Sequence, residues 1–264
     1  MNWLRRFVLS PAQEAEDEMA LADAAAHRGD WEAALAIWGP RAHAGDARAQ
    51  NNIGACFAGG LGVDRDAGLA VKWLTLAAEA GDAAGRRNLA NMHFRGEGVR
   101  EDPLRAAELY RLAAEAGDAE AQDMLSWMLL EGEIIPPATA EALRLATAAA
   151  HQGLASAMSR LGMMYHNAIG VERDAAEAAR WWAGAAARGD ADAQAMLGAA
   201  LHMGSGVARD PFMGLVWLLR GHAGGSPLAY PFLRAAEDAL PIEEAGRARR
   251  MADEAPAAVT EAVT

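Results

Sequence analysis

Cysteine is nearly absent from this sequence. The 264 residues include one cysteine, Cys56, so the chain cannot form an internal disulfide. This excludes the small secreted domains that are held together by disulfides. Cys56 falls on an apolar helical pattern with no His or Lys nearby in the sequence, which favours a core residue over a nucleophile. A cytoplasmic location is the expectation that follows.

Basic residues are also in deficit. The chain has 24 Lys and Arg against 36 Asp and Glu, a formal net charge of −12. Nucleic-acid binding takes most of its affinity from cationic contacts to phosphate. The charge balance therefore disfavours a nucleic-acid partner.

Long hydrophobic runs are missing as well. Residues 1–10, MNWLRRFVLS, hold five large apolar residues, but the apolar run is shorter than that of a signal peptide and no cleavage pattern follows. Residues 1–12 are predicted to form an N-terminal arm, either frayed or packed, with a weak membrane-surface tether as the alternative. No other segment could span a bilayer. Residues 254–264 are mostly small, lack a core pattern and are predicted to be a disordered tail.

The chain does have an internal repeat of 36 residues. The spacing is kept through the copies without an insertion, which predicts five repeats, 47–82, 83–118, 119–154, 155–190 and 191–225. Glycine closes the units at Gly45, Gly81, Gly117, Gly153, Gly189 and Gly225, and a Gly-Val pair marks the middle at Gly62, Gly98, Gly170 and Gly206.

Each repeat is predicted to form two amphipathic helices, because apolar residues recur at three and four positions in both halves. The glycines between the halves suit a left-handed backbone, and the valine is predicted to plug the space between the helices. Small residues such as Gly54 allow close helix approach, and a large residue such as Trp73 is expected to fill the remaining space. The second helices are predicted to start at N-cap aspartates, namely Asp66, Asp102, Asp174 and Asp210.

Residues 161–194, LGMMYHNAIGVERDAAEAARWWAGAAARGDADAQ, resemble the consensus of the Sel1-like repeat family nearly position for position. The resemblance covers roughly residues 47–225. It implies an all-α, right-handed superhelical solenoid of antiparallel helix pairs, related to tetratricopeptide arrays. It also implies a protein-binding scaffold without a cofactor. The continuous register predicts one elongated solenoid rather than two domains.

The ends of the array depart from the repeat. Residues 13–46 are predicted to be an N-terminal capping helix pair with a short turn, and residues 226–253 to be C-terminal capping helices. The third repeat also departs, because Ile134 and Ala138 stand where the others have the second glycine and the capping aspartate. Its turn must follow a different path. A functional bend and neutral drift are the two interpretations.

Motifs that carry catalysis are absent. The sequence has no nucleophile elbow, no HExxH and no phosphate-binding loop, and its Gly-x-Gly-Val segments sit between helices. His166 and His202 share one slot of adjacent repeats, but that slot offers no third metal ligand, which favours polar surface or packing over a metal site. We therefore expect no enzyme, cofactor or metal. A hydrolase-type enzyme and a membrane-tethered envelope adaptor are the alternatives to a cytoplasmic scaffold.

Arg and Asn gather on the first helices of two adjacent repeats, in a protein that is otherwise acidic. In arrays of this kind the first helices line the concave face. Arg and Asn together can satisfy an anion and an extended backbone, and an aromatic nearby can anchor an apolar side chain. We predict that this face binds a protein or peptide partner with acidic or C-terminal carboxylate groups; an ordinary solvated face is the alternative. The candidate residues are Arg48, Asn51, Asn52, Arg87, Asn88, Asn91, Arg95 and Trp127.

Overall fold

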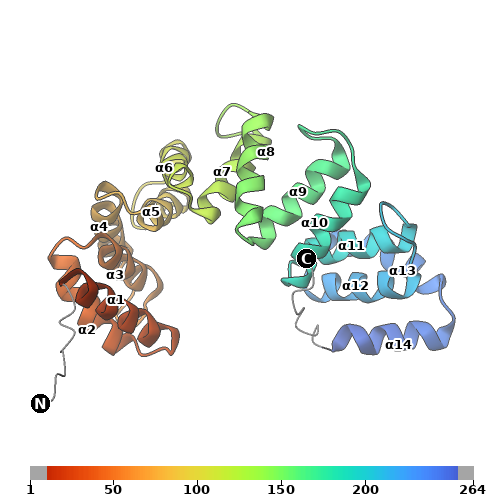
Figure 1. Ribbon diagram of the computed structural model, residues 1–264, viewed down its shortest axis with the longest axis horizontal. Coiled ribbons are helices and arrows are strands. Elements are labelled where there is room, and N and C mark those ends of the chain that lie inside the picture. Colours follow the sequence, from red (N-terminus) through yellow and green to blue (C-terminus); the bar gives the residue numbers. More distant parts are fainter. Residues whose placement is uncertain (1–10, 255–264) are drawn as a thin grey trace, which may run out of the picture. The chain divides into compact units, whose positions relative to one another are not determined.

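The computed structural model describes residues 11–254 (Figure 1). Each helix from α2 to α12 has 13 residues, whereas α1 has 17. All regular elements in this range are helical, which confirms the predicted all-α fold of 36-residue helix pairs. The helices are α1 (Pro11–His27), α2 (Trp31–His43), α3 (Ala47–Gly59), α4 (Ala67–Glu79), α5 (Ala83–Arg95), α6 (Pro103–Glu115), α7 (Ala119–Glu131), α8 (Thr139–His151), α9 (Ala155–Asn167), α10 (Ala175–Ala187), α11 (Ala191–Met203), α12 (Pro211–Ala223), the short 3-10 helix η1 (Pro227–Ala229), α13 (Tyr230–Asp238) and α14 (Ile242–Asp253).

The chain divides into two compact units, Met1–Ala121 and Gln122–Thr264. The first unit contains α1 to α6 and the start of α7, and the second contains the rest of α7 and the helices that follow. The predicted N-terminal arm lies outside the described residues except for the first two residues of α1, and the predicted tail lies outside them except for Glu254. Within residues 11–254, no helix combines the length and the apolar character needed to cross a membrane.

The helix ends follow the predicted chemistry. Asp66 Oδ1 accepts a hydrogen bond of 2.9 Å from the backbone N of Leu69, and Asp102 caps α6 in the same way. Gly60 ends α3 with φ of 69°, in the left-handed region. In the third repeat, Ala138 precedes α8 and gives it no side-chain cap. The cap and turn predictions are therefore confirmed, including the loss at Ala138.

The second glycine of the turn is needed for a further reason. Gly98 has φ of 70°, and a Cβ added to it would lie 2.2 Å from the carbonyl oxygen of Ala67, at the start of α4 in the preceding repeat. In the second unit, a Cβ added to Gly206 would lie 2.0 Å from the carbonyl oxygen of Ala175. The glycine therefore gives the loop its conformation and also lets the loop rest directly on the helix of the repeat before it.

The space beside the small residue of the first helix is filled by a buried large residue of the second helix. A Cβ on Gly54 would lie 2.7 Å from Cγ of Leu74, and Leu74 is fully buried. Tyr110 takes the equivalent place in α6 and is also fully buried. Trp73, expected to fill this space, is only half-buried and packs edge-on against His43, with ring centroids 5.1 Å apart. In the first repeat, Leu74 fills the space beside Gly54, and Trp73 packs against the core from a partly exposed position.

Candidate functional site

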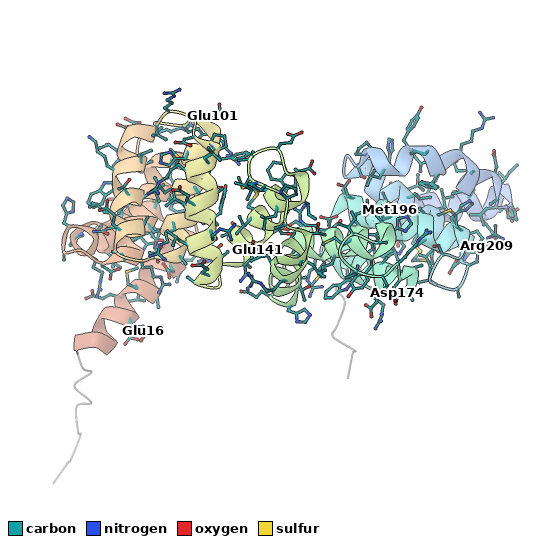
Figure 2. The ribbon with its side chains drawn as sticks, turned by 90° about the horizontal axis from the view of Figure 1, so that it is seen from above. Glu16, Glu101, Glu141, Asp174, Met196 and Arg209 are labelled. Carbon is teal, nitrogen blue, oxygen red and sulfur yellow. The ribbon has the colours of Figure 1, made fainter. Side chains whose placement is uncertain are left out.

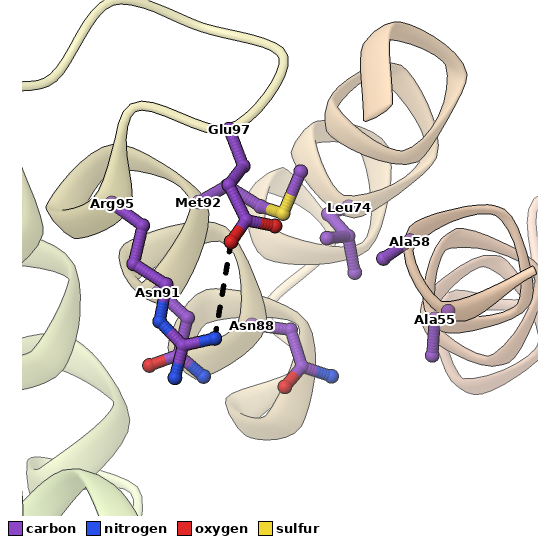
Figure 3. Close-up of a pocket in the computed structure, with 9 residues that line it drawn as sticks. Ala55, Ala58, Leu74, Asn88, Asn91, Met92, Arg95 and Glu97 are labelled. Atoms are coloured by element: carbon purple, nitrogen blue, oxygen red, sulfur yellow. Dashed lines mark ion pairs between the residues drawn. The ribbon is translucent and has the colours of Figure 1, made fainter. Parts of the chain in front are cut away.

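A cleft of about 270 Å³ opens in the first unit between α3 and α5 (Figure 3). The α3 side and the floor are apolar, and they include Leu74 of α4. The α5 side is polar, and it continues into the loop that follows α5. The cleft thus combines an apolar wall with a polar one. Its lining residues are Ala55, Ala58, Gly59, Leu74, Asn88, Asn91, Met92, Arg95 and Glu97.

Helical periodicity explains why the polar residues share one wall. Asn88, Asn91 and Arg95 are spaced by three and four residues, so they lie on one face of α5. The neighbouring positions, Leu89 and Met92, are buried and hold α5 against the core. The side chains opposite them on α3 are alanines, which leave the space open. Two sequence features therefore create the cleft: a polar stripe on α5 and small residues on α3.

Asn91 is oriented by a buried tyrosine. The hydroxyl of Tyr110 donates a hydrogen bond of 2.5 Å to Asn91 Oδ1. Burial raises the pKa of Tyr110 to about 12, so the hydroxyl keeps its proton and remains a donor at neutral pH. Because Oδ1 is used in this way, the Nδ2 group of Asn91 is the part left to donate to a ligand. Nδ2 makes no hydrogen bond with the residues of 11–254.

Asn88 has the complementary arrangement. Its Nδ2 donates a hydrogen bond of 2.8 Å to Oδ1 of Asn51, on the first helix of the preceding repeat. This leaves the Oδ1 of Asn88 as an acceptor. Asn88 and Asn91 therefore offer one acceptor and one donor, one helical turn apart. An extended peptide presents the matching N–H and C=O groups along its backbone.

Charged groups surround the cleft. Arg95 is 68% exposed, and its Nη1 lies 3.9 Å from Glu97 Oε1 (Figure 3). Glu97 Oε2 also accepts from Nη2 of Arg65 at 3.1 Å. The same loop then turns outward to the exposed Glu101 (Figure 2). Two guanidinium groups thus face one carboxylate at the rim, in a chain whose net charge is −12.

Other predicted site residues make contacts inside the protein. Arg48 forms an ion pair with Asp23 of α1, and Asn52 Nδ2 lies 3.4 Å from Oδ1 of the same aspartate. Asn51 is only 7% exposed and holds Asn88. These three residues join neighbouring helices and do not line the cleft.

Arg87 is likewise engaged, with Nη1 2.9 Å from Asp118 Oδ2 and Nε 3.3 Å from Glu120 Oε2. Trp127 belongs to the second unit and is half-buried, so its role as an anchor stays a prediction. Of the eight candidates, the structure brings three, Asn88, Asn91 and Arg95, into one cleft.

Sequence reasoning missed several lining residues. Leu74 and Met92 were hidden because apolar repeat positions look like core, and Glu97 because it occupies the variable position of the Gly-x-Gly-Val turn. Arg65, which contacts Glu97, lies in the preceding loop and has no signature of its own. The available signal was the run of small residues on α3 opposite the polar stripe of α5.

The fold is that of a helical-repeat protein, with a cleft between the first helices of its first two repeats. A family model described as Sel1 repeat matches residues 47–82, 83–118, 119–154, 155–190 and 191–225. The chain therefore belongs to the Sel1 repeat family. Proteins of this family are generally scaffolds for protein–protein interaction and are typically not enzymes.

A solved structure agrees with the fold. A Sel1 repeat protein from Oxalobacter formigenes is 26% identical, with a TM-score of 0.75 over 91% of this chain and 98% of its own. A putative Sel1 repeat protein from Klebsiella pneumoniae is 22% identical, with a TM-score of 0.49 over 75% of this chain and 97% of its own. Among curated proteins, none matches this chain.

Proposed function

We propose that the cleft between α3 and α5 binds an extended segment of a partner protein. The observation that carries this proposal is the pairing of an Asn88 acceptor with an Asn91 donor opposite an apolar wall. The backbone of a strand-like segment would satisfy the two amides, and one of its apolar side chains would pack on Ala55 and Ala58. The general scaffolding role of the Sel1 repeat family supports the same function.

Preorganisation supports binding of a flexible segment. The two amides sit on rigid helices, and each is held by a hydrogen bond through its other end. A ligand therefore orders only itself, and modest contact area can suffice. The proposal is narrower than the sequence prediction, because Arg48, Asn51, Asn52 and Arg87 are assigned to holding the repeats together. A cytoplasmic location belongs to the proposal, and cell fractionation would test it.

Partner capture followed by variants of the cleft tests the function. The full chain is used to capture proteins from a lysate, and a captured partner is then titrated against purified variants. Ala58→Leu fills the apolar wall and should weaken binding at least tenfold. Asn91→Ala removes a directional donor worth about 1 kcal/mol, which is roughly a fivefold loss. Asn167→Ala is the matched control, because Asn167 is an exposed Asn at the end of α9.

Melting midpoints must accompany these titrations, because Asn91→Ala leaves the buried Tyr110 hydroxyl without its acceptor. The proposal requires that Ala58→Leu weaken the partner while the fold is intact. Wild-type affinity in both cleft variants would place the partner elsewhere on the molecule.

A further inference from the structure

Glu97 occupies the position between two arginines at the mouth of the cleft. Its Oε2 lies 3.1 Å from Arg65 Nη2, and its Oε1 lies 3.9 Å from Arg95 Nη1. Arg65 comes from the loop between α3 and α4, whereas Arg95 ends α5. Both arginine side chains are more than half exposed, at 61% and 68%, so solvent and ligands can reach them. The Glu97 carboxylate is thus within ion-pair distance of two guanidinium groups.

The backbone around these groups is rigid. The N–H of Glu97 donates to the carbonyl oxygen of Met92 at 3.0 Å, and Gly96 and Gly98 on either side have positive φ. Arg65 Nε donates to the carbonyl oxygen of Ala58 at 3.0 Å, which holds its guanidinium above the end of α3. The guanidinium of Arg65 is thus held by the backbone, whereas the Glu97 carboxylate can move out from between the two arginines by rotation of the Glu97 side chain.

We propose that Arg65 and Arg95 recognise a carboxylate of the bound segment, and that Glu97 competes for the same position. This inference rests on the proposed function, since the carboxylate must arrive on a peptide lying in the cleft. Guanidinium groups suit carboxylates because their N–H donors match both oxygens. Solvent-exposed ion pairs contribute little to stability, so a ligand carboxylate displaces Glu97 at low cost. A ligand without a carboxylate gains nothing from displacing it, which makes Glu97 a specificity filter.

The arrangement occurs once along the array. In the next pair of repeats the positions of Arg65, Arg95 and Glu97 are taken by three glutamates, and the later pairs never combine two arginines. The corresponding triplets are Glu101, Glu131 and Glu133, then Pro137, Asn167 and Ile169, then Arg173, Met203 and Ser205. In a chain with net charge −12, this triplet directs an acidic ligand to the junction of the first two repeats.

The test uses synthetic heptapeptides selected with the wild-type full chain from a display library of random C-terminal sequences. The best binder is made in three forms: with a free C-terminus, with an amidated C-terminus, and with any Asp or Glu replaced by Asn or Gln. The last two forms distinguish a terminal carboxylate from a side-chain carboxylate. Each form is titrated against wild type, Glu97→Gln, Arg65→Gln and Glu133→Gln, the control at the same repeat position in the second unit.

Glu97→Gln removes the competing charge, so it should bind the peptide form that carries the carboxylate about three- to fivefold more tightly, a change expected for an exposed ion pair. Arg65→Gln should weaken that form by a similar factor, Arg65→Lys should restore part of the loss, and Glu133→Gln should change nothing. The form that lacks the recognised carboxylate should bind wild type and Glu97→Gln alike.

Two outcomes separate this inference from the proposed function. If selected peptides bind in the cleft but Glu97→Gln leaves the affinity of the carboxylate form unchanged, the competition is wrong while the cleft function stands. Equal tightening of all three peptide forms by Glu97→Gln would overturn it as well, because one of them lacks the recognised carboxylate. If Ala58→Leu has no effect on any selected peptide, or if no peptide is selected at all, both proposals fail.

Discussion

Replacement of Gly98 by alanine probes the contact that ties one repeat to the next. Gly98 has φ of 70°, where a Cβ costs about 1–2 kcal/mol. The new Cβ would also lie 2.2 Å from the carbonyl oxygen of Ala67 and 2.4 Å from its carbonyl carbon, far inside van der Waals contact. Because both groups are backbone, the loop or α4 must shift, which adds roughly 1–3 kcal/mol as in overpacked cores. The expected loss is therefore about 3 kcal/mol.

Gly29→Ala separates the cost of the backbone angle from the cost of the close contact. Gly29 has a similar φ of 77°, but a Cβ there would meet no atom within 4 Å. It should lose only the backbone term, about 1 kcal/mol. Urea unfolding followed by circular dichroism at 222 nm measures both variants. Equal losses for Gly98→Ala and Gly29→Ala would refute the close-contact argument, and the glycine would then matter only for its backbone angle.

Two further predictions concern a helix cap and a buried hydroxyl. Asp102→Ala should lower stability by about 1 kcal/mol in urea unfolding, whereas Ala138→Asp should raise it by a similar amount, because Ala138 has φ of −144° and ψ of 80°, close to the −148° and 85° of Asp102. The pKa of Tyr110 is raised from 10.0 to about 12, so the unfolded chain loses this proton first as the pH rises. The contribution of the raised Tyr110 pKa to the free energy of unfolding is complete below pH 10 and is lost between pH 10 and pH 12, by up to roughly 3 kcal/mol. Urea unfolding at several pH values in this range should show a smaller loss of stability with rising pH for Tyr110→Phe than for wild type. Equal losses in the two proteins would contradict the raised pKa.

Repeat spacing was enough to predict the fold, because each helix pair carries its own start and stop signals. Asp66 and Asp102 cap their helices and Gly60 ends one, all through interactions a few residues apart in the chain. Local interactions of this kind are readable in one sequence. The contact of Gly98 with Ala67 joins residues of different repeats, so sequence reasoning found the backbone requirement of Gly98 but not its close approach.

The candidate site was predicted in part for the same reason. Helical spacing placed Asn88, Asn91 and Arg95 on one face, and the structure keeps them there. The same spacing could not show that Arg87 and Arg48 find carboxylates of neighbouring helices, because those partners lie 25 or more positions away. Polar residues on the first helices of the repeats thus either pair with residues of neighbouring helices or line the cleft. The distances between repeats decide which applies.

The most direct measurement is photo-crosslinking of a captured partner from inside the cleft. A diazirine side chain is placed at residue 58, which lines the cleft, or at residue 104, where the leucine of α6 is 60% exposed and lies outside the cleft lining. The account predicts that the partner crosslinks from position 58 and that unlabelled partner competes the product away, while position 104 gives none. Crosslinking from position 104 with none from position 58 would contradict binding in the cleft between α3 and α5.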